Sequence, residues 1–480
     1  MPTSPPRRWA DLAGRRVGIW GWGVEGRAAQ ARLAALGVRP VVVDEHPTAH
    51  DHPPAHEHPA AQDHPAAQDH PAAQDHPAAH DHPPAAGVLA FAGGGQAALL
   101  ACEVVVKSPG ISRHRLEVTQ MEAAGVEVVG GLGLWMEEVD RSRVVCVTGT
   151  KGKSTTVSVM GHLLAGLGQQ VFVGGNLGGP PYAPGVPGDI DWWVIETSSY
   201  QAIDLWSAPP VVAVTSLHPD HLDWHGSEAT YFSDKLSLCR LPGAATTVAN
   251  GDDPALRARR PALGPHVEWV SAAGGTPAWV SALGLVGGHN VVNGLVAGAC
   301  LTALGVAGAG DQDALGRAAA GFVGLPSRLQ RVGVVAGVEF VDDSLSTNVG
   351  STAAALAAYP GRRVALIAGG YDRGIDYRPL GDVLRRRPAP TILLAVPRSG
   401  PRIAAEVREA GTGPFLEVRE VASEAAAVAA GFDWARPDGV VLLSPAAPSY
   451  GGFEDYKERA AAFTGAMLAA GRRSSTPDDG

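Results

Sequence analysis

One stretch in the first third of the chain combines the residue types that hold phosphate groups. It follows an apolar, β-branched run at 144–148 and leads into a segment with helical spacing. Its members are Gly149, Thr150, Lys151, Gly152, Lys153, Ser154 and Thr155. A strand, a glycine turn and a helix N-terminus direct backbone N–H groups at an anion. Lys153 would reach the terminal phosphates and the Ser154 hydroxyl a magnesium ion.

This turn is a shortened variant of the P-loop. The full pattern has a glycine five residues before Gly152, and Val147 stands there instead. On the pattern alone, a turn that has only a structural role and binds no nucleotide therefore stays an alternative.

Carboxylate and imidazole groups follow two further apolar runs of the same region. Glu196 ends the run at 192–196, while His221 and Asp223 come shortly after the run at 211–216. Open α/β sheets hold their ligands at the carboxyl ends of strands, so we expect these groups beside the phosphate turn. Two Mg²⁺ ions are the natural occupants of such a cluster. The alternative for His221 taken alone is a capping or core histidine.

Another glycine turn, the first in the chain, lies near the N-terminus. Gly21, Gly23 and Gly26 form a G-x-G-x-x-G pattern after a short apolar run. Asp44 ends the next apolar run, close to the spacing at which an acidic residue meets a ribose. A dinucleotide site, another nucleotide site and tight packing of strand on helix all stay open on this pattern.

Composition limits the classes of function. The 480 residues suffice for two to four domains, and a net charge of −10 argues against a nucleic-acid-binding protein. The four cysteines lie far apart without a C-x-x-C pair, which argues against a disulfide framework and a zinc site and fits a reducing compartment. Neither a signal peptide nor a membrane-spanning run is evident, so we expect a cytoplasmic location without membrane contact.

Residues 46–85 differ abruptly from the rest of the chain. An Asp-His-Pro-Ala-Ala-Gln unit repeats every six residues from Asp63, and ten of the 17 histidines lie here. Proline at this density blocks regular pairing, and no apolar side chains are available for a core, so we interpret the segment as a disordered insert. A metal-binding tract is the alternative, because His-rich segments can hold Zn, Ni or Cu.

The last third of the chain alternates apolar runs with helical patterns again. Runs at 338–344, 364–370, 391–395 and 440–444 predict the strands of another doubly wound sheet. The segment around Leu325-Pro326-Ser327-Arg328 resembles a hinge that leads into it.

These segments together resemble the Mur ligase family, ATP-dependent enzymes that form amide bonds in peptidoglycan precursor synthesis and so serve cell-wall growth and division. The matching segments run in family order and, with both flanking domains, cover nearly the whole chain apart from the repeat. They are the turn at 149–155, Gly174-Gly175-Asn176, 196–201, 220–223, Gly288-His289-Asn290, 325–328 and 343–348.

The resemblance implies a domain plan. Three doubly wound α/β domains are expected: a Rossmann-like UDP-binding domain at 1–130, a P-loop ATPase-like centre at 131–326, and a Rossmann-like glutamate-binding domain at 327–480. A monomer that binds only small-molecule substrates is expected.

The resemblance also implies roles for individual residues. Gly21, Gly23, Gly26 and Asp44 would hold UDP, and Gly110 and Asn176 would touch the sugar diphosphate. ATP would be bound by Gly149, Thr150, Lys151, Gly152, Lys153, Ser154, Thr155, Asn290, Arg328 and Asp343. Two Mg²⁺ ions would be held by Ser154, Glu196, His221 and a carbamylated Lys235, with Lys153, His221 and Lys235 as catalytic residues. Glutamate would be held by Thr347, Arg373, Ser449 and Tyr456.

The branch of the family that this chain resembles most joins glutamate to UDP-N-acetylmuramoyl-L-alanine through an acyl phosphate. The chain has Leu345, Arg373 and Tyr456 where D-glutamate-adding members usually have lysine, lysine and phenylalanine. Lysine and arginine are not equivalent around a carboxylate, so the difference favours L-glutamate, which a later epimerase inverts. The D-glutamate-adding activity and a non-catalytic nucleotide-binding protein on the same fold are the alternatives.

Overall fold

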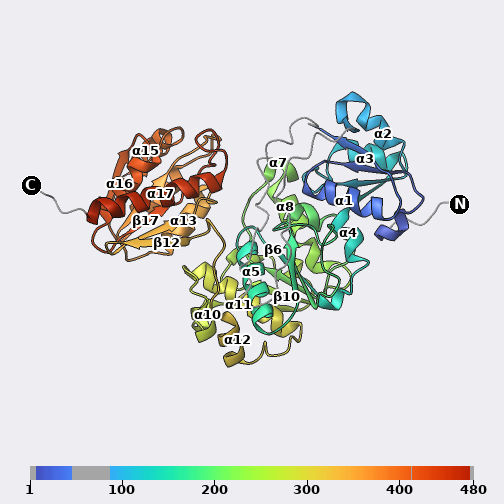
Figure 1. Ribbon diagram of the computed structural model, residues 1–480, viewed down its shortest axis with the longest axis horizontal. Helices are drawn as coiled ribbons and strands as arrows, with labels where there is room; N and C mark the ends of the chain where they lie inside the picture. Colours follow the sequence, from blue (N-terminus) through green and yellow to red (C-terminus); the bar gives the residue numbers. More distant parts are fainter. Residues whose placement is uncertain (1–6, 46–86, 412, 476–480) are drawn as a thin grey trace, which may run out of the picture. The chain divides into compact units, whose positions relative to one another are not determined.

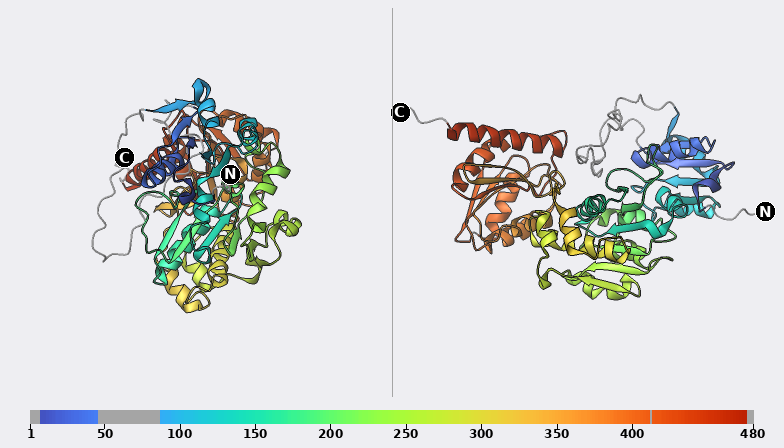
Figure 2. Two further views of the ribbon diagram at one scale, coloured as in Figure 1. Left: turned by 90° about the vertical axis from the view of Figure 1, so that its right-hand side faces the viewer. Right: turned by 60° about the horizontal axis from the view of Figure 1, so that its bottom comes forward.

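The computed structural model describes residues 7–45, 87–411 and 413–475, and the hexapeptide repeat lies outside the described residues. Within them the chain forms three separate sheets, each with helices on its faces (Figure 1; Figure 2). Nearly all neighbouring strands are parallel, which confirms the expected α/β class with three doubly wound sheets.

The first sheet has the strand order β3-β2-β1-β4-β5 and is parallel throughout. Its strands are β1 (Val17–Trp20), β2 (Val41–Asp44), β3 (Val88–Ala90), β4 (Val104–Lys107) and β5 (Glu127–Gly130). Helix α1 (Val24–Ala35) packs on one face, and α2 (Gln96–Leu100) and α3 (Leu116–Ala123) pack on the other. Because β1 is central and buried on both faces, its sequence is continuously apolar up to the first glycine turn.

The second sheet has the order β11-β10-β9-β6-β8-β7. Its strands are β6 (Val144–Thr148), β7 (Val171–Gly175), β8 (Trp192–Glu196), β9 (Val211–Val214), β10 (Thr246–Asn250) and β11 (Val267–Val270). Strand β6 lies between β8 and β9 and is parallel to both. The segments that leave these three strands therefore start side by side at one edge of the sheet.

Short and long helices surround this sheet. They are α4 (Gly131–Met136), α5 (Lys153–Gly166), α6 (Ser199–Ala202), α7 (Leu222–His225), α8 (Glu228–Ser237), α9 (Pro254–Ala258), α10 (Ala278–Ala282), α11 (Gly288–Ala303) and α12 (Gln312–Ala319). Helix α5 packs on β7 and β8, with α12 against its outer side. Helix α8 packs into the hydrophobic core through Tyr231, Phe232 and Leu236.

The third sheet has the order β12-β13-β17-β14-β15-β16. Its strands are β12 (Gln330–Val335), β13 (Val338–Asp342), β14 (Val364–Ala368), β15 (Thr391–Ala395), β16 (Leu416–Glu420) and β17 (Val440–Leu443). The helices α13 (Val349–Ala357), α14 (Arg378–Arg385) and α15 (Gly400–Glu409) cover one face, while α16 (Glu424–Ala435) and α17 (Tyr456–Ser475) cover the other. Edge strand β12 is antiparallel to β13.

The described residues group into two compact units. One unit holds the chain up to Leu283 together with Val292–Phe322, and the other holds Gly284–Val291 and the chain from Val323 onward. The three-domain boundaries expected from the sequence stay a prediction. None of the described helices has the length and apolar character that crossing a membrane requires.

Candidate active site

The glycine turn after β6 has the backbone that the sequence predicts for a phosphate-binding loop. Gly149 and Gly152 have φ values of 138° and 88°, in the region that side chains disfavour. A Cβ on Gly149 would lie 2.1 Å from the Thr215 hydroxyl, and one on Gly152 would lie 2.5 Å from the Asn293 side chain. Glycine is therefore required at both positions, and helix α5 begins directly after the turn, at Lys153.

Two lysines converge on one carbonyl group of this turn. Lys153 Nζ donates to the Gly149 carbonyl at 2.9 Å and to the Thr150 carbonyl at 3.2 Å. Lys235 Nζ, from helix α8, donates to the same Gly149 oxygen at 3.0 Å and lies 4.9 Å from the centre of the Tyr231 ring. The side chain of Lys235 is almost wholly buried. The fold thus brings together two residues that lie 82 positions apart in the sequence.

Burial and mutual repulsion change the ionisation of this cluster. Burial, followed by the charges of Lys153 and Lys151, holds the pKa of Lys235 well below its ordinary value. Burial also lowers the pKa of His221 to about 4, despite the nearby carboxylate of Asp220. The imidazole of His221 is therefore neutral at pH 7, and burial favours the neutral form of the Lys235 amine. Both neutral forms have lone pairs available for bonding, which the protonated forms lack.

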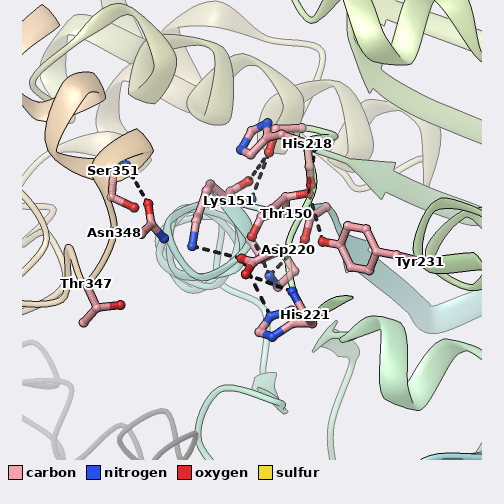
Figure 3. Close-up of polar contacts among 12 residues, drawn as sticks. Thr150, Lys151, His218, Asp220, His221, Tyr231, Thr347, Asn348 and Ser351 are labelled. Carbon is pink, nitrogen blue, oxygen red and sulfur yellow. Dashed lines mark hydrogen bonds and ion pairs between the residues drawn. The ribbon is translucent and has the colours of Figure 1, made fainter. Parts of the chain in front are cut away.

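The turn is tied to the segment that follows β9 (Figure 3). Thr150 Oγ1 donates to the His218 carbonyl at 3.0 Å and contacts the Tyr231 hydroxyl at 3.0 Å. Lys151 Nζ lies 3.3 Å from an Asp220 oxygen, and His221 Nε2 lies 3.8 Å from the same oxygen. His221 has a positive φ of 51°, an unusual conformation for a residue with a side chain. These contacts hold Thr150, Lys151 and His221 at one edge of the second sheet.

The carboxylate expected at the end of β8 is in this region as well. Glu196 is fully buried, and its Oε1 accepts a hydrogen bond of 2.8 Å from Asn176 Nδ2. The backbone N–H of Asn176 donates to the Glu196 carbonyl at 2.9 Å. Ser154 is also buried, on the first turn of α5. Asn176, which we expected at the sugar diphosphate, therefore also orients a predicted metal ligand.

The first glycine turn is closely packed. A Cβ on Gly26 would lie 2.0 Å from the Gly21 carbonyl oxygen, and one on Gly21 would lie 2.6 Å from Ser108 Oγ. Gly23 precedes α1 as its N-cap residue. The buried Asp44 accepts a hydrogen bond of 2.6 Å from the backbone N–H of Trp22, inside the turn. Its carboxylate thus braces the turn in which the sequence predicts UDP binding.

Glu25, in this same turn, was missed by the sequence reasoning. Its two oxygens accept hydrogen bonds of 2.7 Å from the Tyr182 hydroxyl and from Gln201 Nε2. Burial raises the pKa of Glu25 although both bonds oppose the shift. Tyr182 lies in the loop between β7 and β8, and Gln201 lies on α6, so the contact joins the first two sheets. No short sequence pattern signals it, because the three residues are far apart in the chain.

A second polar connection joins the same two sheets. Lys107, at the end of β4, lies 2.5 Å from Asp204, and both side chains are buried. Arg113 lies 3.3 Å from the other Asp204 oxygen. Trp224 Nε1 donates to the Gly110 carbonyl at 3.0 Å, so the predicted sugar-diphosphate residue touches the loop after His221.

The ATP residues predicted in the second unit have partners there. Asp343 is buried and accepts from Leu329 N at 3.1 Å, Ser346 Oγ at 2.5 Å and Ser444 Oγ at 2.8 Å. Burial raises its pKa to about 6. Asn290 Nδ2 donates to the Val286 carbonyl at 2.9 Å, and Arg328 is half-buried between two residues with positive φ. Asp343 therefore organises the loops of its own unit.

The predicted glutamate residues lie in the segments that follow three strands of the third sheet, β13, β14 and β17. Arg373 Nη2 donates to the Thr347 carbonyl at 3.0 Å, which brings together the two residues expected at one carboxylate. Asn348 caps α13, accepting from Ser351 N at 2.9 Å (Figure 3). Ser449 is buried, and Tyr456 begins α17 with its pKa raised by burial to about 12.

Arg459 is a further residue that sequence reasoning missed. It is buried on α17, and it donates to the Ser344 carbonyl at 2.6 Å and to the Ala447 carbonyl at 3.2 Å. Burial lowers its pKa to about 10. It therefore connects the loop before Thr347 with the loop before Ser449. An arginine within an amphipathic helix gives no sequence signal of this role.

Two parts of the chain match Mur ligase families. Residues 147–280 match the Mur ligase middle domain, and residues 327–447 match the family described as Mur ligase, glutamate ligase domain. These ranges include the phosphate turn, Lys235 and the Asp343 loop.

Relatives match over nearly the full length. A UDP-N-acetylmuramoyl-L-alanine--L-glutamate ligase of Micromonospora sp. is 41% identical over 96% of this chain and 98% of its own. Proteins of the same name from Salinispora tropica and from Xanthomonas euvesicatoria pv. vesicatoria are 38% and 35% identical, over 96% and 95% of this chain and 99% and 96% of their own.

Solved structures share the fold. A MurF ligase of Thermotoga maritima in complex with ADP aligns with a TM-score of 0.53 at 14% identity, over 97% of this chain and all of that one. A MurF of Acinetobacter baumannii has a TM-score of 0.52 at 17% identity, over 76% of this chain and 90% of its own. Identity along nearly the whole length, more than any one motif, shows that the chain belongs to the Mur ligase family of ATP-dependent, amide-bond-forming enzymes.

Proposed function

We propose that this chain joins L-glutamate to UDP-N-acetylmuramoyl-L-alanine, with ATP cleaved to ADP and phosphate, in peptidoglycan precursor synthesis. The relatives named above carry this activity in their names and match at 35–41% identity. A cytoplasmic location, a monomeric state and a downstream epimerase that inverts the added residue form part of the proposal.

The contact of both Lys153 and Lys235 with the Gly149 carbonyl carries the proposal. Two ammonium groups on one oxygen repel each other unless one loses its charge or an anion lies between them. Polyphosphate is such an anion, and the amides of the turn and the N-terminus of α5 add to its attraction. Lys153 is therefore the residue that we assign to the transferring phosphate.

We assign a different role to Lys235. Burial holds the pKa of its amine well below the ordinary value, which favours the neutral form, and a neutral amine adds to CO₂ to give a carbamate and release one proton. The carbamate would replace a repelling cation by oxygen donors. A negative carbamate on Lys235 would attract the ammonium group of Lys153, whereas an ammonium group on Lys235 would repel it.

The residues of this cluster fit a pair of magnesium ions. Glu196 and a carbamylated Lys235 offer oxygen donors, Ser154 a hydroxyl, and His221 a neutral imidazole. Ser154 and Glu196 would hold one ion, and His221 with Lys235 the other. When bound, magnesium would neutralise the charge that builds up on the phosphoryl oxygens.

The proposed reaction has two steps. A carboxylate oxygen of the L-alanyl residue attacks the γ-phosphorus of ATP; the bond to the β–γ bridging oxygen breaks, giving an acyl phosphate and ADP. The neutral amine of glutamate then attacks the acyl carbon; the bond from that carbon to the phosphate oxygen breaks, inorganic phosphate leaves, and the nitrogen loses one proton as the amide forms. Both steps gather negative charge, which Lys153 and the amides of the turn stabilise from fixed positions.

Glutamate would be held by the segments that follow β13, β14 and β17 of the third sheet. Arg373 and Thr347 are already in contact, and Arg459 holds the loops that carry Thr347 and Ser449. We assign one carboxylate of glutamate to Thr347 and Arg373 and the other to Ser449 and Tyr456. ATP brought to the first unit must meet this amine, so closure around the segment near Arg328 forms part of the mechanism.

Phosphate release with UDP-N-acetylmuramoyl-L-alanine and each glutamate enantiomer tests the proposal. We expect turnover with L-glutamate, little with D-glutamate, and none without the nucleotide substrate. Chiral analysis of the hydrolysed product checks which isomer was added. Turnover of D-glutamate alone would reverse the stereochemical assignment, and no turnover with either isomer would overturn the substrate assignment.

A further inference from the structure

A cluster of two histidines and one aspartate lies outside the proposed ATP and glutamate sites. His114 comes from the loop between β4 and α3, His225 ends α7, and Asp234 lies on α8. One Asp234 oxygen is 2.8 Å from His114 Nε2 and 2.7 Å from His225 Nδ1. One donor atom from each of the three side chains lies within 4.8 Å of the other two. The cluster joins a loop of the first sheet to a helix of the second.

The surroundings of the cluster suit a metal ion. The His225 side chain is fully buried, and the Asp234 side chain is only 10% exposed. The second ring nitrogen of His225 lies 2.9 Å from the Ser199 hydroxyl, and this hydrogen bond fixes the orientation of the His225 ring. Histidine ligands of metals nearly always have such a partner on the other nitrogen. With Nδ1 bound to a metal, Nε2 would carry the proton and donate it to Ser199.

An open pocket gives access to the cluster. The pocket has a volume of about 490 Å³ and is lined by His114, His225 and Trp224, among others. The His114 side chain is 40% exposed, and its ring packs edge-on against Trp224. A metal held by the three side chains would therefore have an open side for a water molecule, which completes a four-coordinate shell.

We propose that His114, His225 and Asp234 bind a transition-metal dication of the Zn²⁺ class. Two imidazole nitrogens and one carboxylate oxygen suit Zn²⁺ or Co²⁺ better than Mg²⁺, which prefers ligand sets made mostly of oxygen. Tetrahedral ligands around Zn²⁺ lie about 3.3 Å apart, so the present contacts of 2.7 and 2.8 Å must open by roughly 0.5 Å. Rotation of the half-exposed His114 ring opens the 2.8 Å contact, and the 2.7 Å contact of His225 opens only if the Asp234 carboxylate turns.

The site is distinct from the proposed magnesium pair, since it uses none of the residues assigned there. The cysteine spacing argued against a zinc site, but this cluster contains no cysteine. Its ligands come from two sheets, so bound metal would fasten the loop after β4 to α8, directly beside Lys235. The function of the site is then to stabilise the arrangement of the first two sheets.

Zinc binding to the full chain tests the proposal. The metal-free protein is titrated with Zn²⁺ in competition with a coloured chelator, for the wild type, His114→Gln, Asp234→Asn and the control His266→Gln. His266 is exposed and away from the cluster, so its loss matches the histidine count of His114→Gln. The ten histidines of residues 46–85 are present in every protein, so the difference between the variants isolates the cluster.

We expect the wild type and His266→Gln to hold one more tightly bound Zn²⁺ per chain than His114→Gln and Asp234→Asn. Loss of a ligand should weaken this site by at least about 100-fold. Co²⁺ in the wild type should add the visible absorption of a four-coordinate site, which His114→Gln lacks. Equal Zn²⁺ stoichiometry in all four proteins would overturn the proposal and leave a hydrogen-bonded network. Because His114 is half-exposed, its variant decides the question even if Asp234→Asn does not fold.

Discussion

The two glycine turns of the first unit have the same backbone arrangement, but the ionisable side chains around them are acidic at one turn and basic at the other. Each follows a central buried strand and precedes a helix, and each contains a glycine with positive φ. The turn after β1 is braced by the carboxylate of Asp44 and carries that of Glu25, which accepts from Tyr182. The turn after β6 has the amino groups of Lys153 and Lys235 on its Gly149 carbonyl, with Lys151 nearby.

This difference shows that strand–turn–helix geometry alone does not determine what a turn binds. The Trp22 N–H of the first turn already donates to Asp44, so it is engaged within the protein. The positive end of a helix favours anions by only about 1 kcal/mol, so nearby full charges decide the outcome. We therefore expect catalysis to depend strongly on the second turn, and the first turn to contribute to substrate binding and stability.

The largest expected effect comes from Lys153→Ala. The substitution removes a charge that stabilises the transferring phosphate, while the glycines of the turn stay in place. We expect kcat for phosphate release to fall by about 100- to 1,000-fold. Lys151→Ala is the matched control, since its ammonium pairs with Asp220 at the surface, and a few-fold loss is expected there. Similar losses in both variants would contradict the separate roles of the two lysines.

Substitutions of Lys235 test whether this residue acts as a carbamate. Lys235→Ala should lose most of its activity, and added acetate should restore a part by supplying the missing carboxylate. Lys235→Arg should stay inactive, because it keeps a cation next to Lys153 and cannot form a carbamate. Initial rates with increasing acetate make the comparison, with Lys153→Ala as a variant that acetate should not rescue. An active arginine variant would mean that Lys235 serves only as a cation.

Stereoselectivity extends the comparison to the loops of the third sheet, where charge placement should select the isomer. With both carboxylates anchored, inversion of the α-carbon moves the amine by about 1 Å or more, which can reduce the rate by about 100-fold. We expect the paired change Leu345→Lys and Arg373→Lys to erode the preference for L-glutamate more than either single change. The ratio of kcat/KM for the two enantiomers is the measurement. An unchanged ratio in the double variant would exclude these positions as the selectivity determinants.

The smallest effect is expected in the first turn, at Glu25. Its pKa is raised by burial, so between the ordinary value and the raised value the folded protein keeps a proton that the unfolded chain releases. Stability should therefore fall as pH rises above about 4.5 through that window. Glu25→Gln should remove this fall, change stability on the order of 1 kcal/mol, and leave kcat nearly unchanged.

Thermal unfolding midpoints at pH 5 and pH 8 check the prediction for Glu25. Glu127→Gln, at an exposed position in the same sheet, is the control and should keep the pH dependence of the wild type. A large loss of kcat in Glu25→Gln would contradict the assignment of catalysis to the turn after β6 and of stability to the turn after β1.

Much of the framework was predictable from local sequence. The strands β1, β6, β8, β14 and β17 are short apolar runs because they are central and buried on both faces. The edge strands β12 and β16 were not predicted, since their half-exposed positions mix apolar and polar residues. The seven residues of the phosphate turn were found because their chemistry and backbone requirements are contiguous.

Local sequence signals therefore account for the three alternating α/β regions, the two glycine turns and the carboxylates at strand ends. Which charged groups come into contact depends on the folded chain. Lys235 reaches Gly149 across 86 residues, Glu25 meets Gln201 across 176, and Asp234 meets His114 across 120. The physical reason is that ionisation depends on burial and on charges within a few ångströms, and neither follows from neighbours in sequence.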